Sequence, residues 1–123
     1  MTKEELISRN KKFALEVLRM IDTLPSNRIY DALTRQLVRS ATSIGANYRA
    51  ACRAKSDKDF VNKLKIVEEE ADESTYFLDL LGEIDKGKNK EGLRLLFRES
   101  NELTSIYVAS LKTMRAKLKS KKS

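Results

Sequence analysis

Basic side chains recur along one side of the segment between residues 28 and 55, and their type and spacing suit the binding of phosphate groups. At about 100° per residue of a helix, the arginines of this segment fall within an arc of about 80°. A guanidinium presents paired N–H donors that match the oxygens of a phosphate. We therefore interpret these residues, named here the basic stripe, as a candidate nucleic-acid contact. The members of the basic stripe are Arg35, Arg39, Arg49, Arg53 and Lys55.

Carboxylates are the second group of side chains that could support chemistry, because residues 68–73 read Glu-Glu-Glu-Ala-Asp-Glu. Carboxylate oxygens are ligands for Mg²⁺, so a metal-dependent enzyme using Glu69, Glu70 and Glu73 is one alternative. Metal sites inside helical bundles combine Glu with His, however, and the chain contains no His. We favour a solvated acidic face over a metal site and expect no bound metal.

The residues needed for other catalytic chemistry are scarce. Without His, the commonest general base is missing, and the single cysteine, Cys52, cannot form a thiolate cluster. The four glycines are isolated from one another and do not form a phosphate-binding loop. We expect a non-enzymatic protein with no catalytic residue, no cofactor and no small-molecule substrate.

The composition favours helices throughout the chain. Ala, Leu, Glu, Lys and Arg are abundant, only one Pro is present, and no alternating run of β-branched residues indicates a strand. Pro25 interrupts the first periodic segment, Ser56 is placed to cap a later helix, and residues 85–90 form a polar connection with one Gly. We predict an all-α fold with helices at about 2–22, 28–54, 57–84 and 90–117.

Short connections between these helices predict an antiparallel, up-down-up-down four-helix bundle. Its second helix has an inward seam with spacings of three and four residues: Leu33, Leu37, Ser40, Ile44, Asn47 and Ala51. Across the four helices, several seam positions are polar, and we expect their side chains to pair across the core or fix its register, since an unpaired buried amide costs about 1–3 kcal/mol. These positions are Asn10, Ser40, Asn47, Ser74 and Ser100.

The net charge of +7 is distributed in blocks. Residues 112–123 carry six cations and no acid, so the rest of the chain carries only +1. Within that rest, residues 35–55 contribute +5 without an acid, and residues 68–85 contribute −8 without a base. We predict a bundle over residues 1–117 followed by an unstructured basic tail over residues 118–123.

The two charged blocks support three interpretations. Amphipathic helices place charge outward, and neighbouring exposed stripes pair weakly, at about 0–1 kcal/mol per pair. In the second interpretation, the basic stripe of one subunit faces the acidic block of the next and closes a ring, which makes the protein a self-assembling scaffold. In the third, the basic stripe and the tail contact the phosphates of RNA or DNA.

The middle of the chain resembles a family of small helical proteins. Residues 37–48, Leu-Val-Arg-Ser-Ala-Thr-Ser-Ile-Gly-Ala-Asn-Tyr, are similar to the four-helix-bundle proteins encoded in intervening sequences of bacterial 23S ribosomal RNA genes. Residues 53–60, 63–64 and 70–74 continue this resemblance, which covers nearly the whole chain. Ala50 departs from it, because an acidic residue is expected there, and the basic tail is not covered by it.

The resemblance implies a bundle that assembles into a homo-oligomeric ring of five subunits. It also implies similarity to the accessory protein of diversity-generating retroelements, which is associated with nucleic acid through a basic surface. No activity follows for the intervening-sequence proteins themselves. The chain has no apolar run of the roughly 20 residues needed to span a bilayer, and one cysteine suits a reducing compartment, so we expect a cytoplasmic protein without membrane contact.

Overall fold

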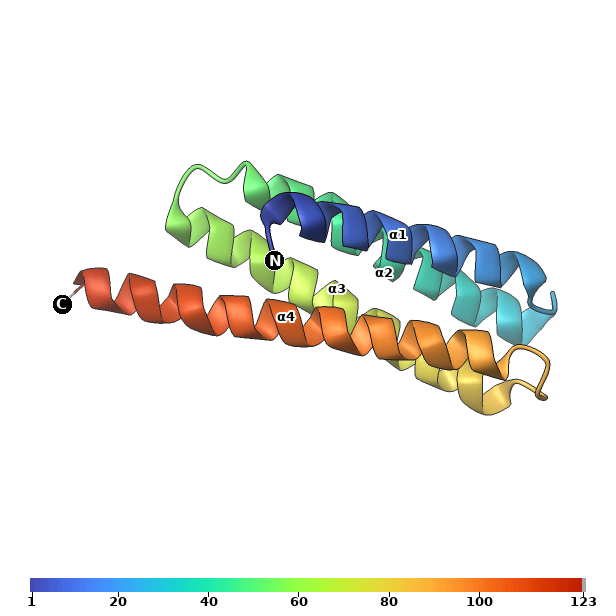
Figure 1. Cartoon of the computed structure of the whole chain (residues 1–123). Helices are drawn as coiled ribbons and strands as arrows, with labels where there is room; N and C mark the ends of the chain where they lie inside the picture. The colour runs from blue at the N-terminus through green and yellow to red at the C-terminus, as the bar shows by residue number, and fades with distance from the viewer. Residues whose placement is uncertain (123) are drawn as a thin grey trace.

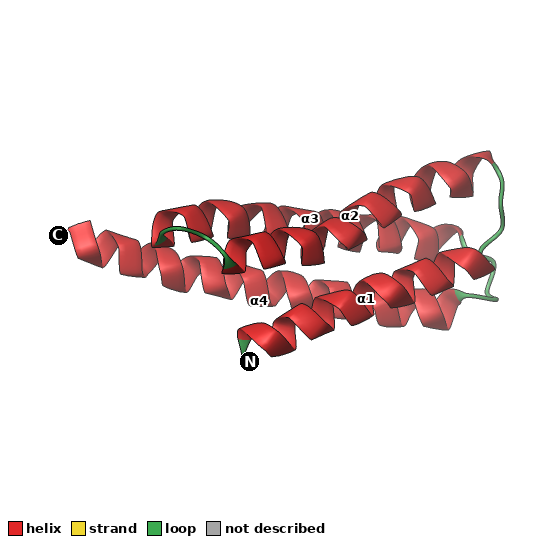
Figure 2. Ribbon diagram, turned by 90° about the horizontal axis from the view of Figure 1, so that it is seen from above, coloured by secondary structure: helices red, strands yellow, loops and turns green. Residues whose placement is uncertain are grey.

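The computed structural model describes residues 1–122 and contains four long helices that run alternately up and down (Figure 1). They are α1 (Lys3–Thr23), α2 (Arg28–Cys52), α3 (Asp57–Ile84) and α4 (Lys90–Lys122). The predicted all-α four-helix bundle is confirmed. Packing is most extensive between α2 and α3 and between α3 and α4, whereas α1 packs mainly on α2 and contacts α4 less (Figure 2).

The first three helices begin after polar residues that supply the capping oxygen. Ser56 accepts a hydrogen bond from the Asp59 amide at 3.0 Å, as its position predicts, and Asp59 accepts one from the Lys55 amide at 3.2 Å. At the start of α2, the cap is Asn27, which accepts from the amides of Ile29 and Tyr30. These caps end the short connections, so consecutive helices must lie antiparallel.

A single apolar core runs along the bundle axis, and the seam of each helix lies in it. The core includes Leu64, Leu78 and Leu81 of α3 and Leu37 and Ile44 of α2, all of them at most 1% exposed. Among the described residues, no helix combines the length and apolar character needed to cross a membrane.

Four of the five predicted polar seam residues are fully buried and hydrogen-bonded. Ser74 donates to Ser40 at 2.8 Å, which joins α3 to α2. Ser100 of α4 donates to the Ala71 carbonyl of α3 at 3.1 Å and pairs with the Thr75 hydroxyl at 2.6 Å. The fourth residue, Asn10 of α1, accepts a hydrogen bond from Tyr107 of α4. These bonds fix the positions of neighbouring helices relative to each other along the bundle axis. They confirm the expectation that polar seam residues pair across the core.

The prediction for Asn47 is wrong. Its side chain is only half-buried and donates to the Ser43 carbonyl of the same helix at 2.9 Å. The adjacent Tyr48 is buried instead, and its ring lies 5.8 Å from that of Tyr107. A tyrosine ring fills the space between α2 and α4 that an amide would leave open, so α2 turns Tyr48 rather than Asn47 inward.

The fourth helix differs from the prediction at its C-terminal end. It continues to Lys122 instead of ending at residue 117, so residues 118–122 are helical rather than an unstructured tail; residue 123 of the expected tail lies outside the described residues. Leu118 packs against the core, and Lys121 donates to Asp57 of α3 at 2.8 Å. Because this segment also consists largely of strong helix formers, packing and propensity both extend the helix.

Candidate nucleic-acid interface

The five members of the basic stripe are exposed on α2 and on the connection that follows it. Arg49 lies in the last turn of α2 and Arg53 is its C-terminal cap. Cations are favoured there, because the carbonyl end of a helix carries partial negative charge. The local sequence thus places three cations, Arg49, Arg53 and Lys55, at one end of the bundle.

One member of the basic stripe is balanced within the chain itself. The Arg39 guanidinium donates to Glu70 of α3 at 3.1 Å and also to Glu73. All three side chains are partly exposed, so the pairing contributes at most about 1 kcal/mol to stability. For Arg39, the structure therefore matches the interpretation in which neighbouring charged stripes pair within one chain.

The remaining members of the basic stripe divide into two places. Arg35 and Arg49 are fourteen positions apart, which is about 21 Å along a helix. The two arginines therefore cannot contact the same phosphate. Arg49, Arg53 and Lys55 share the end of the bundle at which α1 begins and α4 ends (Figure 1).

Two further lysines lie at this end that sequence reasoning did not assign to the site. Lys3 of α1 and Lys117 of α4 line the same cleft as Lys55, and the cleft has a volume of about 560 Å³. The Lys3 ammonium lies 5.6 Å from the centre of the Phe60 ring, within the range of a cation–π contact. Antiparallel order was the available signal, because it places the start of the first helix beside the end of the second. We call the cations Lys3, Arg49, Arg53, Lys55 and Lys117 the basic end.

Asp57 is the acidic residue in the wall of this cleft. Lys121 at 2.8 Å and Lys117 at 3.5 Å lower the pKa of the Asp57 carboxyl, the hydrogen bond from Lys121 being the larger cause. The carboxylate is therefore ionised at neutral pH and holds the end of α4 against the start of α3. It offsets part of the positive charge of the basic end.

Tyr48 and Cys52 lie in the inner wall of the same cleft. Burial raises the pKa of the Tyr48 hydroxyl to about 12, and the neighbouring Cys52 adds to the increase. Tyr48 is therefore neutral at physiological pH and supplies neither a charge nor a base. The cleft is lined by three cations, Lys3, Lys55 and Lys117, and by one carboxylate, Asp57, so its net positive charge suits an anion.

The acidic block of α3 is arranged differently from a metal site. Glu70 and Glu73 are turned toward Arg39, while Glu69 is exposed. Within residues 1–122, no group of three or more potential ligand side chains is placed to hold a metal ion. The alternative of a metal-dependent enzyme based on Glu69, Glu70 and Glu73 thus gains no geometric support.

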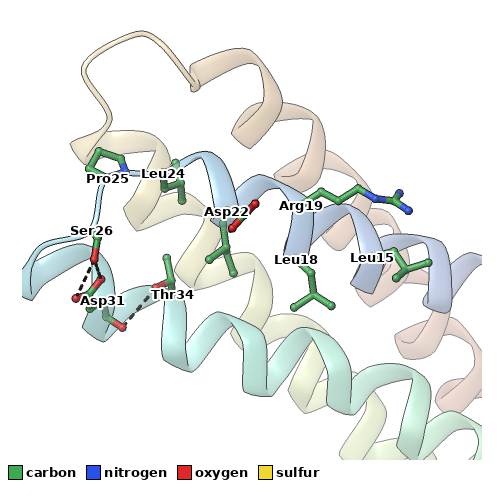
Figure 3. A pocket seen from close by; sticks show the side chains of 10 residues that line it. Leu15, Leu18, Arg19, Asp22, Leu24, Pro25, Ser26, Asp31 and Thr34 are labelled. Atoms are coloured by element: carbon green, nitrogen blue, oxygen red, sulfur yellow. Dashed lines mark hydrogen bonds between the residues drawn. The ribbon is translucent and has the colours of Figure 1, made fainter.

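A separate groove of about 500 Å³ lies beside the turn between α1 and α2 (Figure 3). Leu15 and Leu18 lie along its α1 side, and both are partly exposed. Some of its polar groups are engaged locally, since Ser26 donates to the Asp31 carboxylate at 3.1 Å and Thr34 donates to the Asp31 carbonyl at 3.4 Å. Arg19 and Asp22 also line the groove, which therefore combines leucine side chains with charges of both signs.

Comparison with known proteins relates this fold to a family. A sequence model described as 23S rRNA-intervening sequence protein matches residues 3–109. The chain belongs to the 23S rRNA-intervening sequence protein family. Its fold is similar to the crystal structure of a protein of unknown function from the S23 ribosomal protein family of Bacteroides thetaiotaomicron. The TM-score is 0.79 at 30% identity, and the similarity covers 91% of this chain and 99% of that chain. No curated protein matches the chain.

The match to the 23S rRNA-intervening sequence protein family spans α1 to α3, the first part of α4 and the whole basic stripe. The basic C-terminal segment of α4, including Lys117 and Lys121, lies after residue 109 and therefore outside the match. The basic end thus combines cations from the family region with cations that the family model does not cover.

Arg39→Ala is expected to change the free energy of unfolding by less than about 1 kcal/mol, because exposed ion pairs contribute little. Urea denaturation followed by circular dichroism measures this change. A loss above about 2 kcal/mol would show that the contacts with Glu70 and Glu73 hold α2 on α3 more firmly than exposed ion pairs do.

Proposed function

We propose that this protein is a non-enzymatic helical bundle that binds RNA or DNA through phosphate contacts made by its basic end. The observation that carries the proposal is that Lys55 shares a cleft with Lys3 and Lys117 from two other helices, while Arg49 and Arg53 are exposed at the end of α2 that leads to Lys55. Convergent cations are a binding device for polyanions, because each contact releases condensed counterions from the nucleic acid. Arg35 lies outside this cluster and serves as an outlying contact.

The test compares two double variants with the same change in net charge. Arg49→Ala/Arg53→Ala removes two cations from the basic end, and Arg19→Ala/Arg98→Ala removes two exposed arginines from other parts of the bundle. Affinity for mixed-sequence RNA and DNA is measured by fluorescence anisotropy between about 50 and 200 mM salt.

We expect the first variant to bind at least about tenfold more weakly at low salt and to reduce the slope of log K against log salt by about 2. The second variant is expected to bind within about twofold of the natural protein. Equal losses in both variants would mean that net charge alone governs binding, and the assignment of the basic end would then be wrong.

A second candidate function is self-assembly into a homo-oligomeric ring, with five subunits as the family resemblance implies. The supporting observation is that pairing within the chain uses Arg39, Glu70 and Glu73 but leaves other charges of both signs exposed. Glu69 and Asp72 on α3 and Arg35 on α2 remain available to a second copy. Opposite charges on the two faces favour such an arrangement.

Light scattering at low and high salt, with and without a short RNA, distinguishes the two candidates. An assembly that persists in high salt and takes up RNA at low salt supports nucleic-acid binding by a surface outside the subunit interface. An assembly that dissociates in high salt and never takes up RNA supports the scaffold and contradicts nucleic-acid binding.

A further inference from the structure

The last turns of α4 present a row of cations on a fixed helix. Lys112, Arg115 and Lys119 are spaced by three and four residues, so they share one face of α4 within an arc of about 60°. All three side chains are exposed, and no ion pair joins them to another described residue. They are distinct from Lys117 and Lys121, which pair with Asp57.

The helix that carries these cations is held in place from its other sides. Leu111 is buried, and Met114 and Leu118 pack against the core. Asp57 of α3 pairs with the exposed Lys117 and Lys121. The row of Lys112, Arg115 and Lys119 is therefore preorganised, and binding to it does not have to order a flexible tail.

The surroundings of this row hold charges of both signs. Lys65 of α3 donates to Glu68 at 2.6 Å, and Glu68, followed by Glu69, raises the pKa of the Lys65 ammonium, while the Arg115 guanidinium has a smaller, opposite effect. The positive charge of this surface therefore comes from Lys112, Arg115 and Lys119 themselves.

The geometry of the row fits a nucleic-acid strand. Lys112 and Lys119 are seven positions apart, which is about 10 Å along the helix. One strand of a duplex carries a phosphate about every 3.4 Å along the axis, so three cations span about three phosphates.

The row lacks the groups that single strands require. Single-stranded nucleic acids are bound largely by stacking of bases on aromatic side chains. Residues 110–121 contain no aromatic residue, and Tyr76, the one exposed large aromatic among residues 1–122, lies on the acidic helix α3. Insertion into a membrane is also unsupported, because the apolar side of this segment is already packed on the core.

We propose that Lys112, Arg115 and Lys119 form a docking surface for the backbone of double-stranded nucleic acid, without readout of base sequence. This inference rests on the proposed nucleic-acid function and deepens it, because it names the duplex as the bound form and adds a contact surface outside the family-matched residues. Together with the basic end, the row extends the contact along α4.

The test uses a triple variant, Lys112→Gln/Arg115→Gln/Lys119→Gln, in the full chain. The matched control is Lys86→Gln/Lys88→Gln/Arg98→Gln, which removes three exposed cations from the opposite half of the bundle. The probes are a mixed-sequence duplex of about 16 base pairs, its scrambled counterpart, an unstructured single strand of the same length, and phosphatidylserine vesicles. Circular dichroism checks that each variant keeps its helix content.

For the triple variant we expect duplex affinity to fall about 10- to 100-fold at 50 mM salt, with a decrease of about 2 to 3 in the salt slope. The control variant is expected to bind the duplex within about twofold of the affinity of the natural protein. The natural protein is expected to bind the scrambled duplex within about twofold of its affinity for the original duplex. The natural protein should bind the duplex more tightly than the single strand.

Several outcomes would overturn this inference. Unchanged duplex binding in the triple variant, with loss in Arg49→Ala/Arg53→Ala, would leave the proposed function intact and remove the α4 row from it. Equal binding of single strand and duplex would overturn the duplex assignment. Vesicle binding that falls in the triple variant would assign the row to anionic membranes. Absence of binding to every nucleic acid by the natural protein would overturn the proposed function as well.

Discussion

Tyr107→Ala is expected to lower the free energy of unfolding by about 3–5 kcal/mol, because removing a large buried ring leaves a cavity that the surrounding helices fill only in part. Tyr107 is fully buried and is among the largest side chains of the core. It joins α4 to Tyr48 of α2 by ring contact and to Asn10 of α1 by a hydrogen bond. Urea denaturation followed by circular dichroism measures the loss.

Tyr107→Phe separates the contribution of the hydroxyl from that of the ring. This change removes the donor to the Asn10 side chain, whose amide nitrogen already has no hydrogen-bond partner among the described residues. Asn10 is fully buried, so we expect the loss of this bond to cost about 1–3 kcal/mol.

A double-mutant cycle provides the control for the hydrogen bond. Asn10→Leu removes both polar groups of the amide, and the combination with Tyr107→Phe leaves no unpaired polar atom from the two residues. The double variant is therefore expected to be more stable than the sum of the two single losses predicts. Strictly additive losses would contradict the view that the two side chains act as a pair.

The helices were predictable because the capping residues and the apolar spacing indicate the same helix bounds. Ser56 can cap only the residues that follow it, and the apolar spacing after it continues to Leu81 without a break. Pro25 disfavours helical backbone at the preceding residue and so ends the helix before the first connection. Few Gly and Pro residues leave no competing place for a turn, so the periodicity determines both the number of helices and their order.

Side-chain orientation near the edge of the core was less predictable. Asn47 and Tyr48 are adjacent and lie on either side of the seam formed by Leu37, Ile44 and Ala51. Sequence periodicity does not determine which side of that seam is covered, because the deciding contact is made by Tyr107, which lies on another helix. The same reason applies to Arg9, whose guanidinium binds Glu99 and Glu102 of α4 across the least extensive helix contact.

The sequence predicted which cations of the candidate site are exposed better than it predicted which of them lie close together. The exposure of the basic stripe follows from amphipathicity, since arginines opposite an apolar seam must face outward. The pairing of Arg39 with Glu70 depends on the relative heights of α2 and α3, which the buried Ser40–Ser74 hydrogen bond helps to fix. The recruitment of Lys3 and Lys117 to the basic end depends on where the first and last helices start and end.

The protein is expected to lose stability at alkaline pH between about pH 10 and 12. An unfolded tyrosine ionises near pH 10, whereas burial raises the pKa of Tyr48 to about 12 in the folded chain. Burial also raises the pKa of Tyr107, against a smaller opposing effect of its hydrogen bond to Asn10. Between these pH values the folded state binds more protons than the unfolded state, so the free energy of unfolding falls as pH rises. Below pH 10 both states keep the tyrosine protons, and this contribution to stability is fully present.

Urea denaturation at several pH values from 8 to 12 measures this dependence, and the expected share of Tyr48 is about 2 kcal/mol by pH 12. Lysines lose their charge in the same range, so the comparison must be made between variants. Tyr48→Phe removes the ionising hydroxyl and is expected to flatten the decline, although it changes stability at pH 8 as well. Tyr76→Phe is the matched control, because Tyr76 is 58% exposed. An equally steep decline in Tyr48→Phe would mean that Tyr48 ionises without cost in the folded chain, and that its neutral hydroxyl does not stabilise the contact between α2 and α4.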